Sequence, residues 1–510
     1  TEWIFLLREI LTYPPLRELD WQNITMLTHH RCVRRHYQQA AFCAVAIMVM
    51  LLSSSVHAAQ WSVAPSLTVS ETYIDNVRLS SNSDKQSDLV TQINPSVALT
   101  GNGKNLTLSL RYNLQNLVYL DEPSRNNSYH QLRSSLNATL LPQRLFIDAS
   151  TSLSQQVLSP DDKVSIGNLG VVSNRSDVLS TRVSPYLRSR LGENLQTEIR
   201  YSYDNVSYSD SSALNSSSGG LSVNLRPNRA LGSWSWQLNW QQREIYYDDR
   251  ADERRESASL RVSYQVSARI GFNGVAGIEN NKYSSQRASP RGEYWNLGAN
   301  WRPSSRTNLS ATAGERFFGR TWSLNFAHQA RRHNWGLSYA ESISSRRALQ
   351  SEIRELLLID PDGNPVIDPD TLEPRLFSVA FPVSFNQVFI RKTATANWGM
   401  RTKKTTSGIS VFTEQRSFEG NGVVDEIFGS TLRWSWQVSR KNQFSTSMTW
   451  RKTLREDNDD IFRVASASLS QRINKSASAS ISLRRLQRVG DSINNTYTSN
   501  TITASLRISW

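Results

Sequence analysis

The chain has 510 residues, of which 38% are hydrophobic, and a mean hydropathy of −0.48. This composition excludes a bundle of membrane-spanning helices, because each such helix needs about 20 consecutive apolar residues. The formal net charge is +14, which makes membranes, acidic polymers and nucleic acids the partners to consider. The chain nevertheless contains 15 Trp, 17 Tyr and 16 Phe, a heavy aromatic load for so polar a sequence.

Residues 26–58 have the features of a secretory signal peptide. Arg31, Arg34 and Arg35 precede an apolar core at 40–52, and small residues follow. An anchoring helix is the alternative, but the apolar core is short and polar serines follow it. The pattern therefore predicts export from the cytoplasm.

We place the cleavage after Ala58, because Val56 and Ala58 satisfy the small-x-small rule, and cleavage after Ala59 is the alternative. The predicted organisation is an N-terminal extension plus leader at 1–58 and an exported domain at 59–510. Residues 1–25 fit no targeting pattern, and Met26 is a plausible natural start. Both cysteines, Cys32 and Cys43, lie before the cleavage site, so we expect no disulfide and no thiolate metal site in the exported domain.

Beyond the leader, apolar and polar residues alternate with a period of two, which predicts strands whose two faces meet different surroundings. In 104–120, Leu106, Leu108 and Leu110 share one face, while Arg111 and polar residues occupy the other. No stretch has the pattern of a long amphipathic helix. The same alternation recurs in chain order at 232–247, 257–266, 430–438, 476–485 and 501–510.

The connections between these strands alternate in length. Short ones such as LGEN, RPSSR and RTKK separate pairs of strands, and longer polar ones such as SPDDKVSIGNLGVVSNRS lie between the pairs. Short periplasmic turns at one rim and long extracellular loops at the other are typical of outer-membrane barrels. We therefore predict an all-β fold, a single-chain transmembrane antiparallel β-barrel of about 22 strands, within a range of 18–24.

The last strand, TITASLRISW, ends on an aromatic residue. Leu506, Ile508 and Trp510 lie on its apolar face, which we expect to meet lipid, while Arg507 faces the lumen. An alternating strand with a terminal aromatic residue is similar to the signal that the bacterial barrel-assembly machinery reads. We predict that these three apolar residues form the assembly signal and that the strand pairs with the first strand near Trp61.

Nine arginines share the parity of the polar strand faces, and we predict that they point into the lumen. A basic lumen would favour anionic solutes. The alternative is that acidic residues such as Glu198 neutralise these arginines, and the sequence leaves both interpretations open. The nine are Arg111, Arg133, Arg188, Arg200, Arg261, Arg433, Arg451, Arg484 and Arg507.

The longest connection, at about 347–385, is a candidate gate for the mouth of the barrel. Within it, residues 359–370 contain Asp360, Asp362 and two further aspartates, whose oxygens could hold calcium. DPDGN is also an ordinary turn sequence, and no glutamate closes a twelve-residue calcium loop, so turn chemistry is the favoured interpretation.

The exported domain carries no catalytic motif. Its three histidines, His130, His328 and His333, lie beside no nucleophile and carboxylate in a recognisable pattern. We therefore expect no enzyme activity and no cofactor.

Four stretches of the exported domain are distinctive: SETYIDNVRLS at 70–80, the run at 87–119, LFIDASTSLSQQ at 145–156 and IDPDGNPVIDP at 359–369. These stretches resemble the PEP-CTERM/exosortase-system-associated outer-membrane proteins. The resemblance extends over essentially the whole exported domain, and its motifs are structural. It implies an association with exopolysaccharide and exosortase systems at the outer membrane, and it carries over no catalytic site.

The sequence thus predicts a channel in the bacterial outer membrane that conducts or exports polar, anionic material such as exopolysaccharide. Its expected partners are outer-membrane lipid, the assembly machinery and periplasmic export components, but not nucleic acid. The first alternative is a non-conducting barrel that docks surface polymer or proteins. A ligand-gated transporter with a plug is the second, and it is disfavoured because alternation begins already at about Trp61.

Overall fold

The computed structural model describes residues 60–159, 162–210, 214–229, 232–287, 290–345, 347, 387–456, 459–491 and 496–510. The chain divides into two compact units, 1–58 and 59–510, and the described residues all belong to the second. The predicted leader at 26–58 therefore lies outside the described residues.

The second unit is a sheet of 22 antiparallel strands, as many as the alternation predicts. The first eleven are β1 (Gln60–Ile74), β2 (Asp88–Asn102), β3 (Leu106–Tyr119), β4 (Asn127–Leu141), β5 (Leu145–Val157), β6 (Arg175–Leu191), β7 (Leu195–Tyr208), β8 (Ser216–Pro227), β9 (Trp234–Tyr247), β10 (Glu253–Gln265) and β11 (Ile270–Lys282). The other eleven are β12 (Arg291–Ser304), β13 (Thr307–Arg316), β14 (Gly319–Gln329), β15 (His333–Ser345), β16 (Val388–Arg401), β17 (Thr405–Phe418), β18 (Val424–Gln437), β19 (Asn442–Leu454), β20 (Asp460–Arg472), β21 (Ala477–Gly490) and β22 (Tyr497–Ser509).

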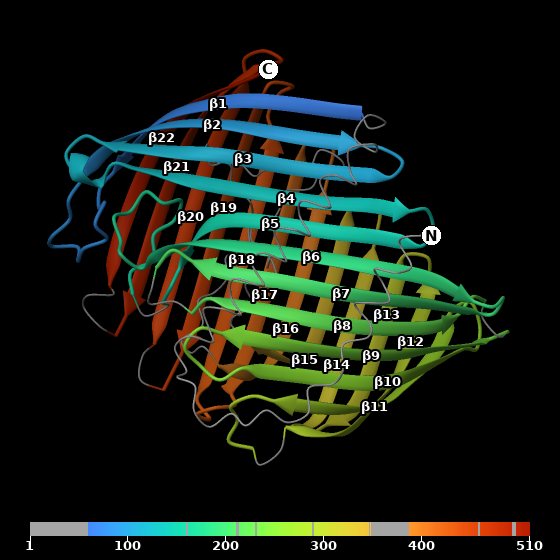
Figure 1. The fold of residues 1–510 in the computed structure, drawn as a ribbon. Helices are drawn as coiled ribbons and strands as arrows, with labels where there is room; N and C mark the ends of the chain where they lie inside the picture. Colours follow the sequence, from blue (N-terminus) through green and yellow to red (C-terminus); the bar gives the residue numbers. More distant parts are fainter. Residues whose placement is uncertain are drawn as a thin grey trace, which may run out of the picture. The chain divides into compact units, whose positions relative to one another are not determined.

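The sheet closes into a barrel because β1 pairs with β22, from Ser66 opposite Ser509 to Ile74 opposite Thr501 (Figure 1). Across this seam the hydroxyls of Thr72 and Thr503 are 3.0 Å apart. Closure removes the two sheet edges, whose unpaired backbone groups could find no water within a bilayer.

The two faces of the barrel wall differ as the alternation predicts. Along β1, Ser66, Thr68 and Ser70 are buried on the inner face, whereas Val69 and Tyr73 are exposed on the outer face. Exposed apolar side chains recur on the outer face of the other strands, which suits contact with lipid. Within the described ranges, no helix is long and apolar enough to cross a membrane.

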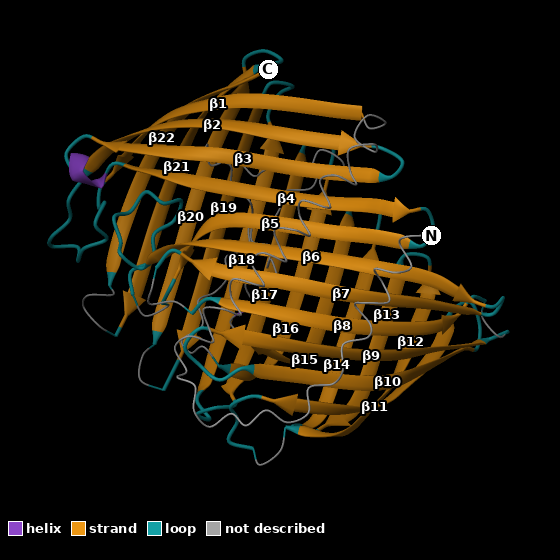
Figure 2. Cartoon of the chain, in the orientation of Figure 1, coloured by secondary structure: helices purple, strands orange, loops and turns teal. Residues whose placement is uncertain are grey.

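The barrel has two different rims (Figure 2). At one end, ten connections of two to six residues join β2 to β3, β4 to β5, and so on to β20 and β21. We call these ten connections the short-turn rim. The other end is the long-loop rim, where the connections include residues 75–87 and 158–174 and the short 3-10 turn η1 (Pro123–Arg125). One connection at the long-loop rim, between β13 and β14, has only two residues, Phe317 and Phe318.

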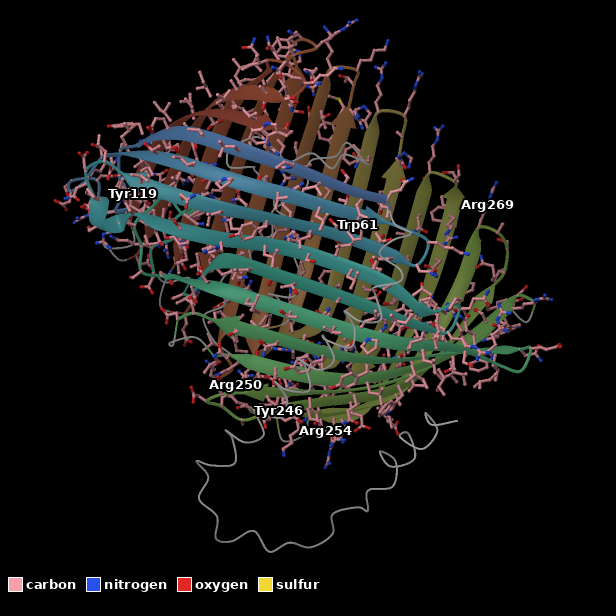
Figure 3. All side chains as sticks on the ribbon, turned by 45° about the horizontal axis from the view of Figure 1, so that its top comes forward. Trp61, Tyr119, Tyr246, Arg250, Arg254 and Arg269 are labelled. Carbon is pink, nitrogen blue, oxygen red and sulfur yellow. The ribbon has the colours of Figure 1, made fainter. Side chains whose placement is uncertain are left out.

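Trp61 covers a glycine near the short-turn end of β1 (Figure 3). It lies directly opposite Gly101 of β2, and a Cβ atom built on Gly101 would lie 2.6 Å from the indole ring. Only glycine leaves the ring room to lie flat on the neighbouring strand, an arrangement that stabilises glycines in sheets.

The predicted assembly signal lies on the outer face of the seam. Leu506 is opposite Val69, and Ile508 is opposite Leu67. The backbone N–H of Trp510 donates to the carbonyl of Pro65 at 3.1 Å, and the indole is exposed. The role of these residues in assembly stays a prediction.

The seam register can be tested with an engineered disulfide between Ser70 and Ser505, which are directly opposite each other on the inner face. In a chain whose native cysteines are replaced by serine, we expect S70C/S505C to crosslink on mild oxidation, because directly opposed Cβ atoms lie about 4.5–5.5 Å apart. Faster migration of the boiled, unreduced protein on a denaturing gel measures this crosslink.

The matched control is S70C/A504C, which moves one cysteine to the adjacent position on the outer face. Crosslinking of this control at the same rate would contradict the seam register.

Candidate functional site: the lumen wall and an inward loop

The strand register places all nine predicted arginines on the inner face. Arg507 is opposite Thr68, whose side chain is buried inside, and Arg111 and Arg133 are opposite one another on β3 and β4. The same parity holds for the remaining six. The structure then separates these arginines by their partners.

Acidic residues neutralise Arg188 on β6 and Arg200 on β7. Glu198 accepts a hydrogen bond from Nε of Arg188 at 2.8 Å and one from Nε of Arg200 at 3.3 Å. Asp148 of β5 lies 2.8 Å from Arg200. The guanidinium of Arg200 also lies over the ring of Tyr186, 3.7 Å from its centroid. For these two arginines the structure agrees with the alternative interpretation of the sequence, in which acidic residues such as Glu198 neutralise the lumen arginines.

Arg451 is also paired with a carboxylate. It lies 3.6 Å from Asp460, whose other oxygen accepts a bond from Arg488 at 2.9 Å. Both Asp460 and Arg488 are buried. The sequence analysis did not single out this cluster, although both side chains have inward parity near the long-loop ends of their strands.

Five other predicted arginines have no carboxylate within ion-pair distance among the described residues. One of them, Arg507, donates to the hydroxyl of Ser66 at 3.4 Å. The other four are Arg133, Arg261, Arg433 and Arg484. Arg133 lies opposite Arg111, and the cross-strand neighbours of the other three are small or neutral. Arg433 is opposite Ser447, and Arg484 is opposite Ser466 and Thr501. These four side chains therefore leave positive charge on the lumen wall.

Serine and threonine hydroxyls cover much of the wall near the seam. Ser445 pairs with Ser468 at 2.8 Å, and Ser480 pairs with Ser505 at 2.7 Å. Each hydroxyl keeps further donor or acceptor capacity after forming one such bond. A wall of hydroxyls and guanidinium groups can contact oxyanions and sugars through hydrogen bonds.

Five more arginines, which the sequence analysis did not single out, face the lumen near the short-turn rim. Each lies among the last three residues of its strand and has inward parity: Arg190, Arg226, Arg302, Arg401 and Arg472. All five are exposed. At equivalent positions, Gln265 and Gln437 bind their own turns instead, and Nε2 of Gln437 donates to the carbonyl of Ser439 at 2.7 Å.

The connection between β5 and β6, residues 158–174, is anchored to inner-face side chains of the wall. Nε2 of Gln115 donates to the carbonyl of Gly167 at 3.1 Å, and the hydroxyl of Tyr119 donates to the carbonyl of Leu169 at 2.9 Å. Nδ2 of Asn168 donates to Oε1 of Gln115 at 2.8 Å. Gly167 and Asn168 both have positive φ, of 70° and 65°, and this local turn brings Asn168 against the wall.

Apolar residues hold this inward loop in place. Leu169 packs with Ile74, Val90 and Leu117, which are apolar and buried on the inner wall at the long-loop ends of β1, β2 and β3. On the other side of the seam, Ile166 and Val172 pack against a second cluster of Leu79, Leu486 and Tyr497. The β1–β2 connection, 75–87, joins both clusters through Val77 and Leu79.

Polar bonds fix the same loop at three further residues. The N–H of Val171 donates to the carbonyl of Val77 at 2.8 Å. The hydroxyl of Tyr497 donates to the carbonyl of Val164 at 2.9 Å, and Arg488 donates to the carbonyl of Asp162. The loop therefore narrows the lumen along the wall formed by β1–β3 and β20–β22.

Most of the predicted gate at 347–385, including the calcium candidate at 359–370, lies outside the described residues. Arg347 is described and buried, and its guanidinium contacts Asp204 at 2.5 Å and the hydroxyl of Ser216 at 2.8 Å. Among the residues that the structure describes, no three His, Cys, Asp or Glu side chains are grouped so that they could hold a metal ion.

A second, largely buried ionic cluster lies on β16 and β17. Glu414 accepts a bond from Nε of Arg416 at 2.7 Å and lies 3.3 Å from Nε of Arg391. Glu414 and Arg416 are about 1% exposed. Charges buried this deeply are tolerated only with close partners, so Glu414 holds the two arginines in place.

Comparisons with known proteins place the fold. No protein-family model and no curated protein matches the sequence. Among solved structures, the siderophore receptor PirA from Acinetobacter baumannii is similar with a TM-score of 0.52 and 8% identity, over 88% of this chain and 80% of that chain. A mutant of the ferric enterobactin receptor PfeA from Pseudomonas aeruginosa is similar with a TM-score of 0.51 and 10% identity, again over 88% of this chain and 80% of that chain. At these identities the likeness shows the fold, a closed 22-stranded barrel of the outer-membrane type.

Removing the Glu414 carboxylate should destabilise the barrel. We expect Glu414→Gln to lower the free energy of unfolding by about 3 kcal/mol, because it leaves Arg391 and Arg416 buried beside each other without their shared carboxylate. Urea unfolding in detergent micelles, followed by tryptophan fluorescence, measures this change. Glu426→Gln, a change on the outer face of the neighbouring strand, should cost less than about 1 kcal/mol; an equal loss in both variants would contradict a special role for Glu414.

Proposed function

We propose that the protein is an outer-membrane channel for polar solutes that favours anions. The observation that carries this proposal is the set of lumen-facing arginines without carboxylate partners among the described residues, Arg133, Arg261, Arg433 and Arg484. Guanidinium groups stay charged at all physiological pH values. In a confined lumen, fixed positive charge raises the local concentration of anions and lowers that of cations.

The arginines near the short-turn rim support the same proposal. Arg190, Arg226, Arg302, Arg401 and Arg472 come from five strands spread along the sheet, so the positive charge is distributed around the opening. Anions arriving at this opening would meet it first and the four wall arginines afterwards. The hydroxyls between the arginines would replace part of the solute's hydration shell.

The inward loop at 158–174 sets the narrowest part of this path in the proposal. Barrels of 16–18 strands already leave an aqueous channel, and 22 strands enclose a wider lumen that requires partial filling to be selective. The two apolar clusters and the bonds from Gln115 and Tyr119 hold the loop against one wall. The loop would act as a fixed constriction on the side of the lumen formed by β1–β3 and β20–β22.

Two finer assignments remain part of the proposal. The resemblance to exosortase-associated proteins suggests exported exopolysaccharide as a cargo, and a hydroxyl-rich wall suits a sugar chain. The short-turn rim would then face the periplasm. PirA and PfeA are siderophore receptors by name, and at 8–10% identity their ligands do not carry over to this chain. The alternative is a non-conducting docking barrel, which the firmly anchored loop favours.

Channel selectivity provides the first test. In a planar bilayer under a salt gradient, we expect steady conductance with a reversal potential that indicates anion preference. Replacing Arg133, Arg261, Arg433 and Arg484 together by glutamine should lower the ratio of anion to cation permeability by at least about twofold, because four fixed charges leave the lumen.

The matched control removes four arginines from the outer face, Arg254, Arg320, Arg463 and Arg485, which have the opposite parity. The net charge changes equally, so an equal loss of selectivity in this control would contradict the lumen mechanism. Absence of conductance in the unmodified protein and in the loop variant described next would favour the docking barrel.

The inward loop provides the second test. Replacing residues 163–172 by a five-residue Gly-Ser linker should raise the single-channel conductance by about twofold or more, because the loop no longer narrows the lumen. Deleting residues 80–84 at the tip of the neighbouring β1–β2 connection, which contribute no residue to the two apolar clusters, is the control and should leave conductance nearly unchanged. Unchanged conductance in the first variant would show that residues 163–172 do not limit the path.

A further inference from the structure

The two rims of the barrel differ sharply in charge. The ten connections of the short-turn rim contain twelve Lys and Arg residues and a single acidic residue, Glu193. Nine of the ten connections carry at least one of these basic residues, and all twelve are exposed. At the long-loop rim, acidic and basic residues are mixed, as in the β9–β10 connection, where Asp248, Asp249 and Asp252 surround Arg250.

Basic side chains at the short-turn rim lack the acidic partners that are common at the other rim. Among the described residues, no ion pair involves Lys104, Arg144, Arg269, Lys404, Lys441 or Lys475. At the long-loop rim, by contrast, Arg254 lies 3.4 Å from Glu256, and Arg78 pairs with Glu122. Figure 3 shows Arg269 at one end of the barrel and Arg250, Arg254 and Tyr119 at the other.

The basic turns adjoin a belt of aromatic residues on the outer face. Trp234, Tyr264, Trp335 and Trp436 lie within three residues of a short turn, and each is at least 36% exposed. Exposed Trp and Tyr collect at the boundary between the hydrocarbon core and the headgroups of a bilayer. The belt therefore marks where the hydrocarbon core ends on this side of the barrel.

The distance from this belt to the turns matches the thickness of a headgroup layer. A tilted strand advances about 2.5 Å along the barrel axis per residue, so turns two or three residues beyond the belt lie about 5–8 Å from it. Half the difference between the full bilayer and its hydrocarbon core is also about 5–8 Å. Lysine and arginine side chains at these turns therefore reach phosphate oxygens without entering the apolar layer.

We propose that the short-turn rim binds the headgroups of anionic phospholipids in the leaflet that surrounds it. Basic residues occupy nearly every short turn around the circumference, as binding to a surrounding leaflet requires. A soluble acidic protein would instead need a basic patch on only one side of the rim. Each basic residue near a negatively charged surface adds to the attraction. The rim then fixes both the depth of the barrel in the membrane and the leaflet that its short turns face, independently of whether the lumen conducts.

Quenching of tryptophan fluorescence by brominated lipids tests this proposal, because exposed tryptophans such as Trp234 and Trp436 adjoin the basic turns. The full-length protein, purified from membranes in detergent, is reconstituted in phosphatidylcholine vesicles that contain a fixed fraction of either brominated phosphatidylglycerol or brominated phosphatidylcholine. We expect phosphatidylglycerol to be enriched about threefold or more around the barrel at low salt, and this preference to fall at 0.5 M NaCl.

The variant K104Q/R144Q/R269Q/K404Q/K441Q/K475Q should lose most of the preference for phosphatidylglycerol. The matched control replaces six exposed basic residues of the long-loop end, Arg78, Arg125, Arg254, Lys282, Arg291 and Arg320, by glutamine and should keep it. A second variant that exchanges lysine for arginine, and arginine for lysine, at the six rim positions should also keep it. Compact migration of unboiled samples on a denaturing gel shows that each variant is folded.

Equal quenching by the two brominated lipids in the unmodified protein overturns the proposal. Equal loss of preference in the rim variant and in the long-loop control also overturns it, because total charge would then explain the effect. A lipid preference that persists in a non-conducting protein would support the rim proposal while contradicting the channel, so the two proposals can fail separately.

Discussion

The closed hydrogen-bond ladder is the constraint on which the rest of the structure depends. A strand edge within a bilayer would expose N–H and C=O groups to hydrocarbon, so the first and last strands must pair, as β1 and β22 do from Ser66 to Ile74. Closure fixes the register of every strand relative to its neighbours. Because side chains alternate with a period of two, the register also decides which residues line the lumen, and a slip of one residue would turn all of them outward.

An apolar patch on the otherwise polar inner face explains why the loop at 158–174 folds inward. Ile74, Val90 and Leu117 are apolar residues on the inner face of β1, β2 and β3, where water would otherwise cover them. Leu169 and the β1–β2 connection bury these side chains, and burial of apolar area is the dominant favourable contribution to such packing. The arrangement spans the seam, so the contacts that position the loop also join the ends of the sheet.

The lumen charges fall into two groups with different consequences. Near the long-loop rim, carboxylates such as Glu414 and Asp460 each bind two arginines, and these clusters are buried and rigid. On the middle of the wall and near the short-turn rim, arginines such as Arg433 and Arg302 face hydroxyls or open lumen. The first group holds the wall together at one end, and the second leaves positive charge where a solute would pass.

The alternation of residues and of connection lengths determined the barrel, its strand number and the face of each strand residue, because these properties depend on local period and spacing. Only the tertiary structure decided which lumen arginines are neutralised. Arg200 pairs with Glu198, which is two residues away in the sequence, and with Asp148, which is 52 residues earlier. A local sequence pattern cannot predict the second of these pairings, because it does not extend over 52 residues. The inward path of residues 158–174 was equally hidden, since it depends on inner-face residues contributed by β1–β3 and β20–β22, from opposite ends of the chain.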